Sequence, residues 1–482
     1  MKKHFLLLLL GLMSINMAII SGCNRHHSKD VEEPATATIE GPITGTPTLV
    51  STFFSLESVG YEQAEYFISG TANSYRNVNE LHPSGEWQVE AADQAAFTTR
   101  IIVYRPISPA DFNGTVVVEW PNVSAGFESA PEWGLAHTEF IRRGYAWVAA
   151  SSQAVGINHL KDNNASRYGD LIHPGDSFSY DIYAQIAQAI KHPKAIAPLG
   201  RLNPQRLIAA GESQSAHRLM TYANSFGNTY DVYDGFFIHS RLGGSAALSQ
   251  SPQADIPTPD AVYIREDLNK PVLMLQTETD IFLLGSFNNR QNDSDSFRLW
   301  EAAGTAHADL YTAVTGFLDI GNNPAIAAVI ENSSPVPGFL DCAKPVNAGP
   351  QHFITKAAFS ALNQWIIDGT VPPSADRLAT IDDNNFLFDT LGNVKGGIRS
   401  PYVDAPIAIF SGTGQDGSSF CRLFGTTQLF NSSTLSSLYA DNEAYIRAVN
   451  NATDDAVAKG FIVAEDGDLI KAHAAATNIF SL

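Results

Sequence analysis

The chain has 482 residues, and its 30 Lys and Arg against 50 Asp and Glu give a formal net charge of -20. This charge argues against nucleic acid as a partner, because nucleic-acid binding relies on clustered cations that displace counterions. Hydrophobic residues make up 44% of the chain, which is enough for a large core and excludes a disordered protein. No interior stretch approaches the ~20 apolar residues that a membrane helix needs.

The first 22 residues are predicted to be a signal peptide of the lipoprotein type. Two lysines precede an apolar run at 5–20, which ends in Ile20-Ser21-Gly22-Cys23. A basic start, a short apolar run and a small-residue exit are typical of secretory signal peptides. The exit also resembles the bacterial lipobox, in which the cysteine is lipidated. We therefore expect an exported protein, anchored through Cys23 in the cell envelope at the outer membrane or periplasm. The alternative is an ordinary signal peptide that happens to contain a cysteine.

The mature chain is predicted to consist of a tether and one domain. Residues 23–48 begin with the lipidated cysteine and continue as a polar, proline-containing tether. Residues 49–482 are expected to form a single domain that includes a C-terminal extension, from about residue 330. Lipidation of the first cysteine leaves Cys342 and Cys421, and export permits a disulfide between them. Two buried free thiols are the alternative.

Strands and helices are expected to alternate along most of the domain. Strand-like segments fall at 64–69, 97–104, 115–120, 145–150, 207–210, 233–238, 271–276 and 297–303. Helical patterns fall at 131–143, 179–191, 214–224 and 355–368. This alternation predicts an α/β fold with a mostly parallel central sheet flanked by helices. The strand-like runs are almost continuously apolar, which suits strands covered on both faces.

One serine lies in the local context that nucleophilic catalysis requires. The sequence Gly211-Glu-Ser213-Gln-Ser215 stands between an expected strand and an expected helix. Gly-x-Ser-x-small in that position is the nucleophile elbow of α/β-hydrolases, a sharp turn that exposes the serine hydroxyl. Two other copies of the pattern, around Ser177 and Ser245, lack the strand before or the helix after. Ser213 is therefore the predicted nucleophile, and a structural turn serine is the alternative.

A serine nucleophile needs a histidine base and a carboxylate that orients it, in the chain order Ser, acid, His for this fold. One expected strand runs directly into Glu278 and Asp280, of which Asp280 is the predicted acid and Glu278 the competitor. His307 follows the next strand and is the predicted base, with a structural loop histidine as the alternative. His239 precedes the acid, so we expect it, like His352, to be a pocket or packing residue.

The remaining chemistry concerns backbone donors and a glycine-rich turn. An oxyanion hole requires N–H groups aimed at the developing charge. We expect one from Gln214 and one from the loop after 115–120, at Asn122 or Val123. The sequence Gly412–Gly417 spells GxGxxG, but neither the helix nor the later acidic residue of a dinucleotide site follows. We interpret it as a turn. No CxxC or HExxH motif occurs, so the sequence predicts no metal and no cofactor.

Taken together, these motifs resemble a bacterial family known as the alpha/beta-hydrolase domain family. The resemblance extends from about Tyr61 onward and rests on Glu119–Ser124, Gly211–Ala216, Thr277–Asp280, Ala303–Asp309, Gly349–His352 and Cys421–Gly425. It implies serine hydrolase chemistry and places the C-terminal extension within the family unit.

The expected activity is hydrolysis of carboxylic esters, in small molecules or polymers, through an acyl-enzyme. A peptidase or an acyltransferase with the same triad is an alternative, as is a non-catalytic envelope lipoprotein that binds a partner.

Overall fold

The computed structural model describes residues 33–330, 340 and 342–481, all of which belong to one compact unit, Val31–Leu482. The predicted signal peptide and Cys23 lie outside the described residues. In the part of the chain that is described, no helix is long and apolar enough to cross a membrane.

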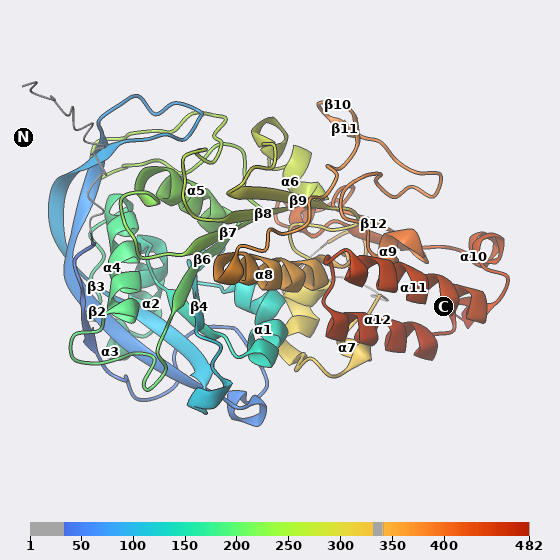
Figure 1. Ribbon diagram of the computed structural model, residues 1–482, viewed down its shortest axis with the longest axis horizontal. Coiled ribbons are helices and arrows are strands. Elements are labelled where there is room, and N and C mark those ends of the chain that lie inside the picture. Colours follow the sequence, from blue (N-terminus) through green and yellow to red (C-terminus); the bar gives the residue numbers. More distant parts are fainter. Residues whose placement is uncertain (1–32, 331–339, 341, 482) are drawn as a thin grey trace, which may run out of the picture. The chain divides into compact units, whose positions relative to one another are not determined.

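A nine-stranded sheet forms the centre of the fold, in the order β1-β2-β3-β5-β4-β6-β7-β8-β9 (Figure 1). The six strands from β5 to β9 in this order are parallel, whereas β1, β2 and β3 form an antiparallel edge that pairs with β5. The alternation of the sequence predicts the parallel part, but not the long β2–β3 hairpin. The strands are β1 Thr38–Glu40, β2 Tyr61–Asn77, β3 Val89–Pro106, β4 Thr115–Glu119, β5 Ala146–Ala150, β6 Arg206–Glu212, β7 Gly235–His239, β8 Val272–Thr277 and β9 Phe297–Ala302.

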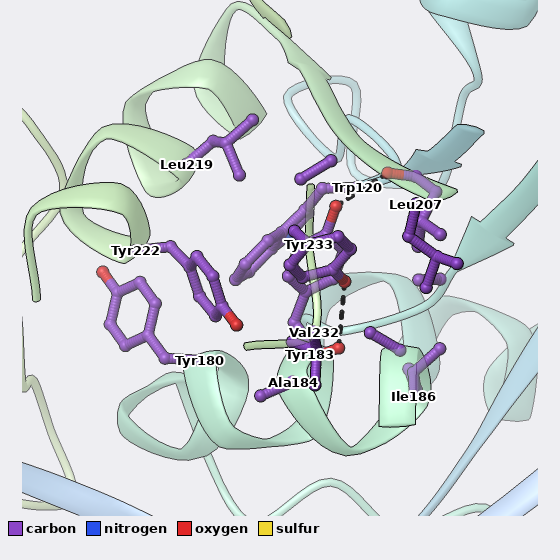
Figure 2. Packing of buried hydrophobic residues seen from close by; sticks show 14 of the residues in the cluster. Trp120, Tyr180, Tyr183, Ala184, Ile186, Leu207, Leu219, Tyr222, Val232 and Tyr233 are labelled. Atoms are coloured by element: carbon purple, nitrogen blue, oxygen red, sulfur yellow. Dashed lines mark hydrogen bonds between the residues drawn. The ribbon is translucent and has the colours of Figure 1, made fainter. Parts of the chain in front are cut away.

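Helices cover both faces of the parallel part. On one face lie α1 (Pro131–Arg143) and α8 (Gln351–Asp368), and on the other lie α4 (Ser179–Lys191) and α5 (Gln214–Phe226). The helices and the sheet enclose one hydrophobic core on each face. Alternate residues of β4 enter the two cores: Val117 packs in the core under α1, and Val118 packs in the core under α4. Figure 2 shows the core of α4 and α5, where the hydroxyl of Tyr233 donates to the Tyr183 carbonyl at 3.1 Å. Burial on both faces explains why the strands read as continuous apolar runs.

The C-terminal extension builds most of a third core, together with Leu310, Ala327 and Ala328 from the segment before it. Its long helices, α11 and α12, are not predicted by the sequence, because their buried faces include polar residues such as Thr453 and Asp466, which an apolar pattern does not mark. The remaining elements are α2 Ala154–Asn163, α3 Ala165–Tyr168, α6 Glu278–Phe282, α7 Pro324–Ala327, α9 Pro401–Asp404, α10 Ser432–Leu438, α11 Asn442–Ala458, α12 Ala464–Ala476 and the strands β10 Thr380–Asp382, β11 Asn385–Phe386, β12 Ala408–Ser411 and β13 Thr426–Leu429.

Part of the predicted tether belongs to the folded unit. Strand β1 pairs with β2, and Ala37 and Ile39 are buried in the core. The guanidinium of Arg100 also donates to the Thr48 carbonyl at 2.8 Å. The interpretation of 23–48 as a tether is therefore wrong from residue 33 onward, because the polar segment pairs with backbone groups that the edge of the sheet would otherwise leave free.

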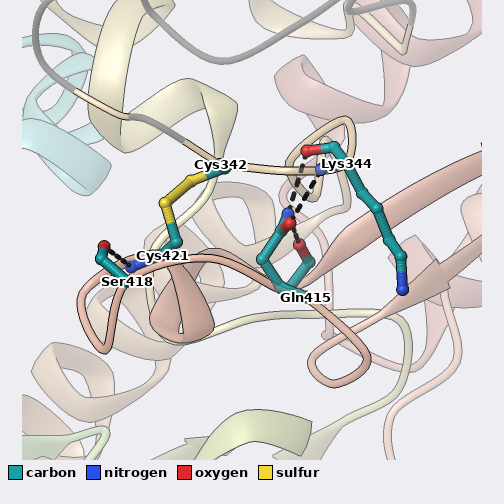
Figure 3. Close-up of a disulfide and its surroundings, with 6 residues drawn as sticks. Cys342, Lys344, Gln415, Ser418 and Cys421 are labelled. Atoms are coloured by element: carbon teal, nitrogen blue, oxygen red, sulfur yellow. Dashed lines mark hydrogen bonds between the residues drawn. A yellow bond between two sulfur atoms is a disulfide. The ribbon is translucent and has the colours of Figure 1, made fainter.

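The disulfide between Cys342 and Cys421 is present, with the two Cα atoms 5.3 Å apart (Figure 3). This confirms the prediction. Beside it, the amide N–H of Lys344 donates to the Gln415 side chain, and the Gln415 amide donates to the Lys344 carbonyl, both at 3.0 Å. The disulfide and the two hydrogen bonds between Lys344 and Gln415 join the segment before α8 to the glycine-rich turn.

Candidate active site

Ser213 occupies the sharp turn between β6 and α5. Its φ of 59° and ψ of -119° place a non-glycine residue in the left-handed half of the backbone map. The turn is held by a hydrogen bond from the Ser213 N–H to the His239 carbonyl at 2.9 Å. A Cβ atom on Gly211 would lie 3.0 Å from the backbone of Ser215, so strand and helix approach closely and a larger residue would press on the helix backbone. This is the geometry of a nucleophile elbow.

The structure brings the three predicted catalytic side chains together. The hydroxyl of Ser213 lies 2.8 Å from Nε2 of His307, and Nδ1 of His307 lies 2.7 Å from Oδ1 of Asp280. His307 stands in the loop after β9, and Asp280 stands in α6 directly after β8. All three side chains therefore lie at the carboxyl end of the parallel strands, where α/β folds place their sites.

Asp280, and not Glu278, faces the imidazole. Its second oxygen, Oδ2, accepts hydrogen bonds from the N–H and hydroxyl of Thr277, at 2.6 and 2.8 Å. The two oxygens of Glu278 instead accept from the N–H groups of Gly304 and Gly412, at 2.7 and 2.9 Å. Burial raises the pKa of Glu278 to about 7. Glu278 thus links two loops and has no contact with His307 in the described structure.

The glycine-rich turn of the extension packs against the segment that carries Asp280. The carbonyl of Gly412 accepts from the Thr279 hydroxyl at 2.6 Å, and its N–H is the one that Glu278 binds. A Cβ atom on Gly412 would lie 2.5 Å from the Thr279 nitrogen, which accounts for the glycine. The extension therefore supports the position of the acid.

The expected oxyanion donors require one correction. Gln214 is the first residue of α5, where N–H groups lack an acceptor within the helix. The N–H of Asn122, in contrast, donates to the Ser129 carbonyl at 2.9 Å and closes the loop after β4. The prediction of Asn122 as a donor is therefore wrong. Within the described residues, the N–H of the adjacent Val123 has no acceptor, so Val123 is the remaining candidate from this loop.

A buried polar group lies behind the triad and includes His239, which the sequence predicts to be a pocket or packing residue. His239 lies with Nδ1 3.3 Å from Oε2 of Glu132 and Nε2 3.4 Å from the amide nitrogen of Gln351. That amide also contacts the His307 carbonyl at 3.3 Å. Burial lowers the pKa of His239 to about 4, so the ring is neutral. These residues come from β7, α1 and α8, and no local motif could have joined them.

Glu212, inside the elbow motif, is a residue whose role the sequence did not predict. Oε1 of Glu212 is 3.1 Å from Nε2 of His307, the same nitrogen that faces Ser213. The one signal for this contact in the sequence is that Glu212 directly precedes the predicted nucleophile.

The competing motifs take structural positions. The hydroxyl of Ser177 donates to the Gln250 carbonyl at 2.8 Å, and Ser245 is buried without a side-chain partner in the described part of the chain. His352 stacks on Tyr311 with ring centroids 3.8 Å apart, as a packing residue. Over the described ranges, no group of three or more His, Cys, Asp and Glu side chains could hold a metal ion.

Comparison with known proteins identifies the class. Residues 31–472 match a family described as "Alpha/beta hydrolase domain", so the chain belongs to this family and has the α/β-hydrolase fold. No curated protein matches the chain.

Two solved structures are similar to parts of the chain. One, from Bacteroides fragilis, is provisionally named an acetyl xylan esterase; it is 10% identical over 51% of this chain, with a TM-score of 0.27. The match spans 63% of that protein's own length. The other, from Klebsiella pneumoniae, is provisionally named a dienelactone hydrolase; it is 15% identical over 49% of this chain and 85% of that one, with a TM-score of 0.24.

Proposed function

We propose that the protein is a serine hydrolase that cleaves carboxylic esters through an acyl-enzyme intermediate. The observation that supports this most is the unbroken hydrogen-bonded chain from Ser213 through His307 to Asp280, built on a strained elbow. A serine hydroxyl is a weak nucleophile alone, and this chain supplies both the base and the group that orients it.

In the proposed reaction, Oγ of Ser213 attacks the ester carbonyl carbon while Nε2 of His307 takes the hydroxyl proton. The N–H groups of Gln214 and Val123 stabilise the oxyanion that forms. As the tetrahedral intermediate collapses, the carbon–oxygen bond to the alcohol breaks and His307 returns its proton to the leaving oxygen. A water molecule, activated by the same imidazole, then releases the acid. Asp280 keeps Nδ1 protonated and stabilises the imidazolium throughout.

We further propose that the enzyme works in the cell envelope, anchored through lipid on Cys23. This rests on the sequence of the first 23 residues, which lie outside the described structure. A lipid anchor would hold the hydrolase at a membrane surface, with part of 23–32 as the remaining spacer.

A substrate panel tests the reaction class. The purified protein is assayed with p-nitrophenyl esters of increasing acyl length, peptide p-nitroanilides, and an ester in the presence of an alcohol acceptor. Ser213→Ala is the matched control. Serine-dependent ester cleavage with water as acceptor supports the proposal. Serine-dependent cleavage of amides alone, or transfer to the alcohol in place of hydrolysis, would reassign the enzyme as a peptidase or an acyltransferase. No serine-dependent turnover would favour a binding lipoprotein.

A further inference from the structure

His307 is flanked by two carboxyl groups, of which the proposed triad uses only one. Asp280 meets Nδ1, and Glu212 meets Nε2 at 3.1 Å, beside the Ser213 hydroxyl at 2.8 Å. Glu212 is buried, and its other oxygen lies 3.3 Å from the side-chain amide of Asn122. The carboxyl is therefore held against the nitrogen that must accept the serine proton.

The effect of Glu212 depends on whether Nε2 of His307 is protonated. When His307 is neutral and donates through Nδ1 to Asp280, Nε2 carries a lone pair, which an ionised Glu212 repels. When His307 is an imidazolium, its Nε2–H donates to the Ser213 oxygen, and the positive ring lies beside the Glu212 carboxylate, with Nε2 and Oε1 3.1 Å apart. An ionised Glu212 thus favours the charged ring, the form that follows proton transfer from the serine. It also makes the neutral ring, which must start the reaction, harder to reach.

We propose that Glu212 is a positioning residue that holds the imidazole of His307 from the serine side and sets the pH range in which it accepts the serine proton. This inference rests on the proposed function.

The surroundings of the pair support the same assignment. Glu212 is also influenced by His239 from β7, Glu132 from α1 and Asp280 from α6. Burial is the largest effect and raises its pKa to about 7. Burial lowers the pKa of His307, but the Glu212 and Asp280 carboxylates outweigh it and raise the pKa to about 9. The charge of Glu212 therefore favours the imidazolium form of His307.

The test is the Glu212→Gln variant. Because the Asn122 amide donates toward one oxygen position, the new side chain places its oxygen there and turns its NH₂ toward Nε2, which favours the neutral ring. Removing an opposite charge at this range lowers a pKa by about 1–3 units. The acidic limb of kcat/KM should therefore move to lower pH by about one unit or more. The plateau at high pH should fall, because the imidazolium of the transition state loses a partner.

Glu278→Gln is the matched control, since Glu278 is also buried with a pKa raised to about 7 and does not contact His307. Its acidic limb should stay where it is in the parent enzyme. If Glu212→Gln unfolds early in a thermal melt, Glu212→Asp replaces it. This variant keeps the charge but withdraws it from Nε2, so a smaller shift of the acidic limb is expected.

A titration without turnover separates this inference from the proposed function. The imidazole of His307 is followed by ¹⁵N NMR in Ser213→Ala, with and without Glu212→Gln, and assigned by its loss in His307→Ala. A lower pKa in the double variant is the expected result. Equal pKa values would overturn the role of Glu212 whatever the enzyme hydrolyses, whereas a clear shift in a protein that lacks esterase activity would overturn only the proposed function.

Discussion

Asp280→Asn should nearly abolish turnover through a change in one proton position. In the native site, Oδ2 of Asp280 accepts from the N–H and hydroxyl of Thr277, and Oδ1 faces Nδ1 of His307 at 2.7 Å. An asparagine must place its single oxygen against the Thr277 donors, so its NH₂ turns toward Nδ1. Nδ1 then becomes an acceptor, and the proton moves to Nε2. An imidazole protonated at Nε2 cannot take the proton of Ser213.

The same change of tautomer costs about 10⁴ in kcat in serine proteases, and we expect a loss of that order here. The assay is the initial rate on the best p-nitrophenyl ester from pH 6 to 10, with Glu278→Gln as the control because that carboxyl lies two residues away and binds backbone N–H groups instead. The control should retain activity within about tenfold. A loss below tenfold in Asp280→Asn, or a larger loss in Glu278→Gln, would contradict the assignment of the acid.

Three further outcomes are expected. Because neighbouring carboxylates outweigh burial and raise the pKa of His307 to about 9, kcat/KM should rise with pH toward that value, and a flat profile between pH 6 and 9 would contradict this. Replacing both Cys342 and Cys421 by Ala should lower the free energy of unfolding in urea by about 4 kcal/mol for a closed loop of 79 positions, whereas an unchanged midpoint would show that packing alone holds the extension. Cys23→Ser should move the protein from the membrane to the soluble fraction, and an unmodified N-terminus in the mass spectrum of the parent protein would refute the anchor.

The sequence was informative wherever the relevant interaction is local. The helices at 131–143 and 179–191 have the predicted bounds because each presents a regular apolar face to the sheet. The elbow at Ser213 was recognisable because a strand, a sharp turn and a helix follow each other within a few residues. His307 and Asp280 could be located because a fixed chain order links each to a strand end.

The sequence failed where a position depends on distant partners. Nothing near Asn122 reveals that its N–H is taken by Ser129, and the β1 pairing depends on a free sheet edge some 30 residues away. Helices α11 and α12 bury polar residues such as Thr453 and Asp466 against the third core, so an apolar pattern does not mark their buried faces. The contact of Glu212 with His307 joins residues 95 positions apart and needs the folded sheet to exist.

Covalent labelling of Ser213 tests the central claim most directly. A fluorophosphonate probe reacts when an activated serine oxygen attacks phosphorus and displaces fluoride, so it reports the nucleophile without any knowledge of the substrate. Peptide mass spectrometry should find the probe on Ser213 in the parent protein and in Ser177→Ala and Ser245→Ala, and nowhere in Ser213→Ala. Labelling that persists in folded Ser213→Ala would contradict the account. So would a parent protein that takes up no probe at about pH 9, near the pKa of His307.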